Sequence, residues 1–146
     1  GQLKTSARNQ FRGVVEQVIP GAVNAEIRLR ITSEHRITAM ITGESLQQMG
    51  IEPGQTMTAL VKAPWVMLAS DPDVAVSTSN KLAGRVARII RGAVNADVVL
   101  ALADGKSISA IITNSSLDNL ALQEGQPAAA FFEAGSVILV ADSHSI

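Results

Sequence analysis

A small set of cationic and hydroxyl side chains could together bind an anion. Ser6 and Arg8 lie in a Ser-Ala-Arg-Asn segment, and Lys62 and Ala63 lie in a later Val-Lys-Ala-Pro-Trp segment. Arg offers a planar fork of N–H donors, Lys a compact charge and Ser a hydroxyl. Backbone N–H groups near Arg8 and Ala63, together with the hydroxyl of Ser45, could complete the set of donors. Such a site suits a fully deprotonated tetrahedral oxyanion, because an anion that keeps a proton would turn it toward other donors.

Most of the chain occurs twice. The segment Gly-Ala-Val-Asn-Ala begins at Gly21 and again at Gly92, and the same offset of 71 residues continues without a gap to the C-terminus. Roughly a third of the aligned positions are identical, which indicates two copies of one small fold. We therefore assign residues 1–72 to a first repeat with an intact oxyanion-binding motif and residues 73–146 to a second repeat with a degenerate motif.

The two cations of the candidate site are present in the first copy alone. At the offset of 71, Arg8 corresponds to Ser79 and Lys62 corresponds to Glu133. Random drift at a protein surface could produce the same difference, and this explanation stays open. The alternative interpretation is that one repeat binds an anion and the other has a structural role.

The composition is that of an ordinary globular chain. Its 146 residues carry a net charge of −1, are 47% hydrophobic and include no Cys. Without Cys, disulfides, thiolate metal sites and Cys nucleophiles are excluded, which fits a reducing compartment and predicts a cytoplasmic protein. No apolar run approaches the roughly 20 residues of a membrane span. The chain begins with Gly instead of Met, which is typical of a cleaved fragment, so we expect a longer natural protein.

The size of each repeat limits how it can be stable. A repeat of about 70 residues is close to the size at which a single hydrophobic core becomes marginal. We therefore expect the two halves to share a buried surface, exchange strands or oligomerise.

Neither catalysis nor nucleic-acid binding finds support in the motifs. His35 is expected in a turn and His144 at the C-terminal tip, both as solvated surface residues. No phosphate-binding glycine loop appears and no His or carboxylate cluster has metal-ligand spacing, so we expect no enzyme and no directly ligated metal cation. Nucleic-acid binding needs a basic groove and stacking aromatics. This chain is slightly acidic and has one Trp, three Phe and no Tyr.

Alternation and turn signals predict five strands and one short helix in each repeat. From Val23 to Ile31, apolar and polar residues alternate over nine positions, as in a half-buried strand. Thr42 is a candidate N-cap, and Gly50 a candidate C-terminal glycine, for a helix over 43–49. The order of three strands, a helix and two strands is typical of an OB-like barrel, so the fold is mostly β. Strands are predicted at 11–19, 23–31, 36–41, 55–62, 65–69, 82–90, 94–102, 107–112, 127–133 and 137–141, the second helix at 115–121 and a linker at 70–78.

Three segments resemble the signatures of molybdate-binding Mop domains, also called molbindins or TOBE domains. They are Thr5–Gln10, Gly21–Glu26 and Val61–Val66, at the spacing of that family. The resemblance covers nearly the whole chain. It implies two tandem OB-like barrels that bind molybdate or tungstate at an interface between subunits. The implied assembly is a homodimer, with a trimer as the alternative.

The resemblance also implies which residues bind the oxyanion. One subunit would contribute its N-terminal and Lys-Ala motifs, and the neighbouring subunit would contribute the start of its helix. A candidate secondary anion site falls on the repeated Val-Asn pairs, for which a purely structural turn is the open alternative. The implied ligands are Ser6, Ala7, Arg8, Lys62 and Ala63, with Ser45 and Thr42 from the neighbour, and the secondary site is Val23, Asn24, Val94 and Asn95.

Two kinds of protein in this family carry a tandem unit. ModE-type transcriptional regulators place it after a DNA-binding domain and lack the cations in the second repeat, whereas stand-alone storage proteins usually keep them in both. The loss of both cations here favours the ligand-sensing domain of a molybdenum-dependent regulator, which would contact DNA only through a missing N-terminal domain. Storage is the alternative, and an accessory domain of a transport ATPase is a third.

Overall fold

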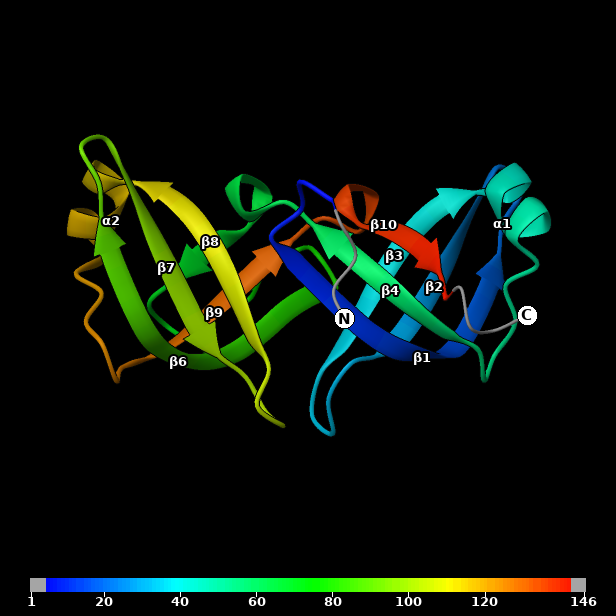
Figure 1. Ribbon diagram of the computed structural model, residues 1–146, viewed down its shortest axis with the longest axis horizontal. Helices are drawn as coiled ribbons and strands as arrows, with labels where there is room; N and C mark the ends of the chain where they lie inside the picture. The colour runs from blue at the N-terminus through cyan, green and yellow to red at the C-terminus, as the bar shows by residue number, and fades with distance from the viewer. Residues whose placement is uncertain (1–4, 143–146) are drawn as a thin grey trace.

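The computed structural model describes residues 5–142, which form two five-stranded sheets lying end to end (Figure 1). Each sheet curls into a barrel-like unit that carries one short α-helix at its outer end (Figure 1). This confirms the predicted fold class, mostly β with two OB-like five-stranded units. The elements are β1 (Asn9–Pro20), β2 (Asn24–Arg30), β3 (Arg36–Thr42), α1 (Gly43–Met49), β4 (Thr56–Val61), η1 (Ala63–Trp65), β5 (Met67–Ala69), β6 (Asn80–Arg91), β7 (Asn95–Ala101), β8 (Ser107–Thr113), α2 (Asn114–Leu120), β9 (Pro127–Phe132), η2 (Ala134–Ser136) and β10 (Ile138–Ala141), where η marks a 3₁₀-helix.

The two repeats exchange their last strands. The strand order is β10-β4-β1-β2-β3 in one sheet and β5-β9-β6-β7-β8 in the other. Ile138 of β10 pairs with Leu60 of β4, and Met67 of β5 pairs with Phe131 of β9. Of the outcomes expected for such small repeats, strand exchange and a shared buried surface are both observed within the chain. Each barrel contains residues of both repeats, so the repeat boundary does not separate the two barrels.

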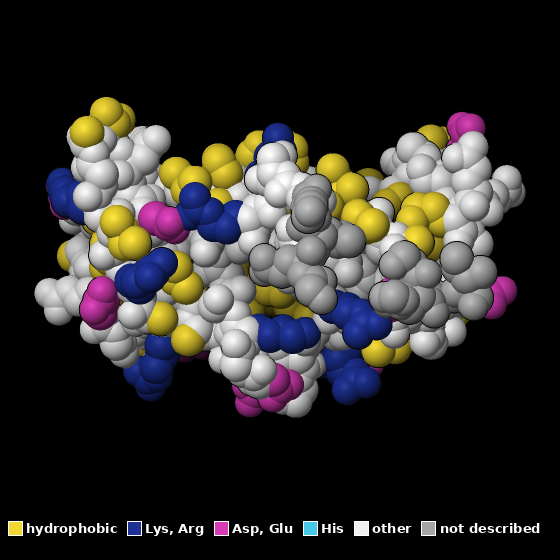
Figure 2. All heavy atoms as spheres, viewed as in Figure 1, with side chains coloured by type: hydrophobic (Ala, Val, Ile, Leu, Met, Phe, Trp, Pro, Cys, Tyr) yellow, Lys and Arg dark blue, Asp and Glu magenta, His cyan; other side chains and the backbone are white. Residues whose placement is uncertain are grey.

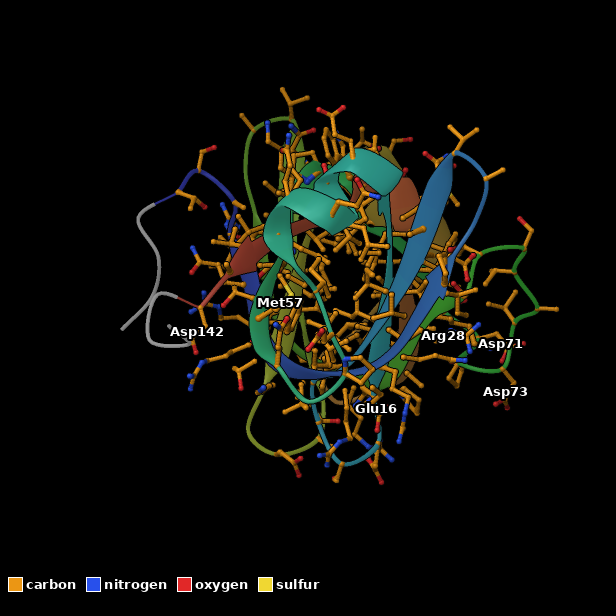
Figure 3. All side chains as sticks on the ribbon, turned by 90° about the vertical axis from the view of Figure 1, so that its right-hand side faces the viewer. Glu16, Arg28, Met57, Asp71, Asp73 and Asp142 are labelled. Atoms are coloured by element: carbon orange, nitrogen blue, oxygen red, sulfur yellow. The ribbon has the colours of Figure 1, made fainter. Side chains whose placement is uncertain are left out.

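Alternating burial produces the core of each barrel. In β2, Ala25, Ile27 and Leu29 are at most 2% exposed, while the residues between them face outward. Figure 3 looks into this barrel, where apolar side chains fill the enclosed space. The alternation predicted from the sequence is confirmed from Asn24 onward, whereas Val23, predicted on the same face, precedes the strand and is exposed.

Two glycines allow β1 and β6 to approach their neighbours closely. A Cβ atom on Gly13 would lie 2.6 Å from the carbonyl oxygen of Arg30, and one on Gly84 would lie 2.3 Å from that of Ala101. Both strands also shift register a few residues further on, between Val15 and Gln17 in β1 and at the equivalent place in β6. Such bulges increase local twist and help a sheet to curl.

The helices begin and end largely as predicted. The Thr42 side chain caps α1 by accepting a hydrogen bond from Ser45 N at 3.0 Å, and Gly50 ends the helix with φ +58°. Helix α2 begins one residue earlier than predicted and is capped by Thr113 in the same way. Ala121 takes the left-handed position there, with φ +51°.

Two predicted segments lie near the repeat junction, a strand at 65–69 and a linker at 70–78. Trp65 lies in η1 and not in a strand, because the 3₁₀ turn that follows Lys62 includes it. Residues 70–78, the predicted linker, contain neither helix nor strand. Among residues 5–142, no helix is long and apolar enough to cross a membrane.

Candidate functional site

A cavity of about 230 Å³ lies where the N-terminal segment meets η1. The first repeat contributes four residues that the sequence singled out, and β8 of the other repeat contributes Ile111. The structure therefore brings most of the predicted anion-binding residues together at the junction of the two repeats. The predicted residues that line the cavity are Ser6, Arg8, Lys62 and Ala63.

The short 3₁₀ turn η1 positions Lys62 and Ala63. Lys62 is extended, with φ −71° and ψ 133°, and its carbonyl accepts from Trp65 N at 3.0 Å. Pro64 sits at the start of the turn, where its fixed φ is favourable and its missing N–H costs little. Ala63 is 2% exposed. The turn thus buries Ala63 and leaves the Lys62 side chain at the surface beside the cavity.

Lys62 also contacts the one tryptophan of the chain. Its Nζ lies 5.4 Å from the centre of the Trp65 ring, within the range of a cation–π interaction. A smaller hollow of about 110 Å³ adjoins the first cavity and is lined by Ser6, Ala7, Lys62 and Trp65 among others. The predicted residue Ala7 lies in this second hollow, and Lys62 borders both.

Arg8 forms an ion pair that sequence reasoning missed. Its Nη1 donates to Oδ2 of Asp97, on β7 of the other repeat. The other carboxylate oxygen of Asp97 is buried and has no hydrogen-bond partner in the structure. The pair engages one terminal nitrogen, so the guanidinium keeps further N–H donors for a ligand. No local motif marks Asp97, because the contact depends on how the two repeats face each other.

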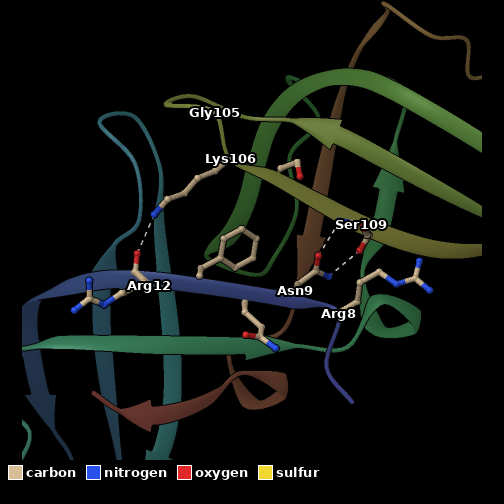
Figure 4. A pocket seen from close by; sticks show the side chains of 9 residues that line it. Arg8, Asn9, Arg12, Gly105, Lys106 and Ser109 are labelled. Carbon is tan, nitrogen blue, oxygen red and sulfur yellow. Dashed lines mark hydrogen bonds between the residues drawn. The ribbon is translucent and has the colours of Figure 1, made fainter. Parts of the chain in front are cut away.

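Asn9 fixes the start of β1 against the other repeat. Its Nδ2 donates to Ser109 O and its Oδ1 accepts from Ser109 N, both at 2.8 Å (Figure 4). Nearby, Lys106 Nζ donates to the carbonyl of Arg12 at 2.9 Å. These contacts border a polar cavity of about 340 Å³ that lies beside Arg8. The residue that follows Arg8 is therefore held to β8, which sets where Arg8 points.

The second repeat keeps this geometry without the cations. Asn80 makes the equivalent pair of hydrogen bonds with the backbone of Thr38, at 2.7 and 2.8 Å. The 3₁₀ turn recurs as η2 after Glu133, which is exposed. The backbone of the motif is thus retained, while the positions of Arg8 and Lys62 hold Ser79 and Glu133.

Ser45 and Thr42 lie away from this cavity. They sit at the start of α1, where Thr42 Oγ1 donates to Ser45 Oγ at 2.9 Å. Figure 1 shows α1 at the outer end of its barrel, whereas η1 lies near the middle of the molecule. Within one chain these hydroxyls do not reach the cavity, so their role in a neighbouring subunit stays a prediction.

The repeated Val-Asn pairs form hairpin turns. Val23 and Val94 are 77% and 71% exposed, the highest values among the large hydrophobic residues described. Gly21 N donates to the carbonyl of Asn24 at 2.9 Å, and Gly92 makes the same bond to Asn95 at 2.8 Å. These contacts support the turn interpretation, and the secondary anion site stays a prediction.

His35 is not the solvated residue that the sequence suggested. It is 9% exposed, with Nδ1 2.7 Å from Thr32 Oγ1 and Nε2 2.9 Å from the carbonyl of Ala83. The prediction of a turn is correct, but the other repeat covers it. His144 lies outside the described residues. Within residues 5–142, no group of three or more His, Asp or Glu residues could hold a metal ion.

Charges on the surface are mixed in sign. Figure 2 shows Lys and Arg side chains interspersed with Asp and Glu across one face, without a continuous basic surface. Six salt bridges pair these groups within the described residues, and most involve half-exposed arginines.

A family model and several known proteins match most of this chain. The TOBE domain model matches residues 5–68 and 76–139. The chain is 46% identical over 138 residues to the molybdenum-pterin-binding protein MopA of Rhodobacter capsulatus, covering 94% of the chain and 52% of the relative. It is 42% identical over 137 residues to the molybdenum transport protein ModE of Azotobacter vinelandii, covering 94% and 51%. The chain thus spans about half the length of these relatives.

A solved structure is similar over its whole length. It is the cytoplasmic molybdate-binding protein ModG with molybdate bound, and it superposes with a TM-score of 0.91 at 39% identity. The similarity covers 96% of this chain and 100% of that chain. The arrangement of both barrels is therefore shared with a protein whose ligand is a tetrahedral oxyanion.

Proposed function

The chain belongs to the TOBE domain family, and from this premise we propose that it binds molybdate or tungstate at the cavity between Arg8 and Lys62. The observation that carries the proposal is the convergence of Arg8, Lys62 and Ser6 on one cavity of about 230 Å³. Two cations and a hydroxyl suit a doubly charged oxyanion that can only accept hydrogen bonds. The role is binding and not catalysis, since the site offers donors without a nucleophile beside a general base.

The same donors give selectivity among oxyanions. A phosphate that keeps a proton would point it toward a donor and lose a hydrogen bond. Sulfate is fully deprotonated but forms a smaller tetrahedron, so its oxygens would reach fewer of the fixed donors at once. Molybdate and tungstate are close in size and charge, and we expect both to bind.

The complete site includes a second subunit. The hydroxyls of Ser45 and Thr42 lie on an exposed helix start at the outer end of the barrel, where a partner chain could reach them. A homodimer with two equivalent sites would complete each cavity in this way, and a trimer is the alternative. A ligand that contacts both subunits favours one arrangement of the assembly by its differential affinity for that arrangement.

We favour a sensing role in a molybdenum-dependent transcriptional regulator of the cytoplasm. The similarity to ModE and the absence of cations at Ser79 and Glu133 support this role. In such a regulator, the ligand-bound arrangement of two chains would set the spacing of two DNA-binding domains. Those DNA-binding domains would belong to another part of the regulator.

A stand-alone molybdate store is the second candidate. It is supported by the end-to-end similarity to ModG, which is described as a cytoplasmic molybdate-binding protein. Native mass spectrometry that counts chains and bound molybdates separates the two candidates. Two molybdates on a dimer favour the sensor, and a trimer or more than two molybdates per dimer favours the store.

Isothermal titration calorimetry tests the binding itself. The chain would be titrated with molybdate, tungstate, sulfate and phosphate at the same ionic strength. We expect heat from the first two anions and at least tenfold weaker binding of the others. An absence of heat with molybdate, or equal affinity for sulfate, would refute the proposal.

A further inference from the structure

We propose that Trp65 is a positioning residue of the anion site, whose indole face holds the Lys62 ammonium beside the cavity. The Lys62 Nζ atom lies 5.4 Å from the ring centre. This inference rests on the proposed function, because it concerns how the same site is prepared for its ligand. It assigns a role to a residue that does not line the cavity between Arg8 and Lys62.

The ring is the specific partner of Lys62 before a ligand arrives. Within residues 5–142, Lys62 forms no salt bridge and its side chain donates no hydrogen bond, in contrast to Arg8 with its Asp97 partner. A lysine side chain that is free to rotate loses conformational entropy when a ligand fixes it. A ring that already restricts the ammonium lowers this loss, and the N–H groups facing away from the ring stay available to an oxyanion.

The fold does not need an indole at this position. Trp65 is 46% exposed, so much of its apolar surface remains in water. The equivalent turn η2 forms with Ser136 in place of Trp65. Glu133, which precedes η2, has φ −77° and ψ 145°, nearly the same backbone angles as Lys62 before η1. The 3₁₀ turn is therefore independent of the tryptophan.

The indole and the cation disappear together in the second repeat. Lys62 is replaced by Glu133 and Trp65 by Ser136, while Ala63 recurs as Ala134. The face of an aromatic ring carries negative potential, which attracts an ammonium and repels a carboxylate. If the ring served only for packing, its presence would not depend on whether the neighbouring side chain is a cation or an anion. The paired change is expected if the two side chains act as one unit.

The test measures molybdate affinity of ring variants by calorimetry. We expect Trp65→Leu to weaken binding two- to five-fold, which corresponds to about 0.5–1 kcal/mol for a half-exposed cation–π contact. Trp65→Phe keeps an aromatic face and should lose less than Trp65→Leu. Ile138→Ala is the matched control, because Ile138 is an exposed apolar residue of the same hollow and is 57% exposed. It should bind like the parent chain.

A double-mutant cycle separates positioning from general packing. In a Lys62→Met background, Trp65→Leu should have no further effect on affinity, because the ammonium that the ring holds is gone. Equal losses in both backgrounds, or parental affinity in Trp65→Leu, would overturn the inference. If Trp65→Leu does not fold, Trp65→Met compared with Trp65→Phe makes the same distinction. A parent chain that gives no heat with molybdate would instead refute the proposed function.

Discussion

The side chain of Asn80 connects the two repeats, because it forms with the backbone of Thr38 the pair of hydrogen bonds that a neighbouring strand would form. Asn80 Oδ1 accepts from Thr38 N at 2.7 Å, and its Nδ2 donates to Thr38 O at 2.8 Å. Asn9 and Ser109 form the same pair on the other side. Asn9 therefore fixes the start of β1 to β8, the edge strand of the other sheet. Asn80 in the same way fixes the start of β6 to β3, the edge strand of the first sheet. The position of the anion site thus depends on both repeats.

Replacing Asn80 by Ala should destabilise the protein by about 2–3 kcal/mol. Asn80 is fully buried, and its loss leaves the N–H and C=O of Thr38 without partners in the interior. Urea unfolding followed by circular dichroism measures the change in the free energy of unfolding. Gln47→Ala removes an exposed amide from α1 and should change it by less than about 0.5 kcal/mol. Equal stability of the two variants would contradict a structural role for this pair.

Replacing Arg8 or Lys62 by Ala should each weaken molybdate binding by about 2 kcal/mol or more, as expected for losing a charged hydrogen-bond donor. The equivalent changes in the second repeat, Ser79→Ala and Glu133→Ala, are matched controls and should leave affinity nearly unchanged. Calorimetry under one set of conditions compares all four variants. A large effect from the second pair would show that the wrong repeat has been assigned as the binding half.

Gly84→Ala should destabilise the protein strongly, by about 2 kcal/mol or more. The new Cβ would lie 2.3 Å from the carbonyl oxygen of Ala101, so β6 and β7 would have to move apart. Gly135→Ala is the control, because its Cβ would meet no atom within 4 Å. Thermal unfolding should place Gly135→Ala near the parent and Gly84→Ala well below it. A similar melting temperature for both variants would show that the sheet adapts without cost.

The link between Ser33 and Asp104 should make stability depend on pH in the acid range. Backbone and side-chain hydrogen bonds from Ser33, at 2.6 and 3.1 Å, hold the pKa of Asp104 below its ordinary value of 3.8. A lowered pKa in the folded state means that this stabilisation is complete above about pH 4 and is lost as the pH falls through the folded pKa.

Asp104→Asn provides the measurement for this link. Asn keeps the shape and tolerates the positive φ of 59° at this position, but it removes the charge. Urea unfolding of the parent and the variant should show a larger difference in stability at pH 7 than at pH 3. A difference that stays constant with pH would show that the charge of Asp104 contributes nothing to the link.

Local signals in the sequence were sufficient for most of the fold. The Thr42 cap, the Gly50 terminus and the alternation through Ile27 and Leu29 each depend on residues close together in the chain, and the structure confirms them. The difference between the repeats identified two residues of the cavity, Arg8 and Lys62, because that comparison needs no knowledge of tertiary contacts. Ser6 and Ala63 recur in the second repeat, and their role was expected from the resemblance to the family.

Contacts between the repeats could not be read from the sequence. His35 looked solvated because its partner, the carbonyl of Ala83, belongs to the other repeat. No local signal marks Asp97 as the partner of Arg8, because the ion pair joins β7 to the N-terminal segment of the other repeat. The choice of strand exchange among the ways to stabilise a small repeat likewise depends on which edges meet in space. These three features depend on contacts across the junction, whereas the 3₁₀ turn that includes Trp65 is a local feature that the sequence also missed.

Strand exchange leads to a prediction for the separated first repeat. In a peptide of residues 1–72, β4 would lack its neighbour β10, and β5 would lack β9. Leu68, which is 9% exposed in the intact chain, would then lose its buried environment. Because exposed strand edges and apolar surface favour association, two copies should pair by exchanging β5. Analytical ultracentrifugation should show a dimer. Circular dichroism should show the β-sheet content of the intact chain.

Mixing the separated repeats tests the specificity of this exchange. A peptide of residues 73–146 should displace one copy of the first repeat from this dimer. In the mixed complex, Asn9 can again form its hydrogen bonds with the backbone of Ser109, and Asn80 with that of Thr38. A one-to-one complex that binds molybdate should form. A folded monomer of residues 1–72 with full affinity would contradict the conclusion that both repeats build the site, since Ile111 and Asp97 would be absent from it.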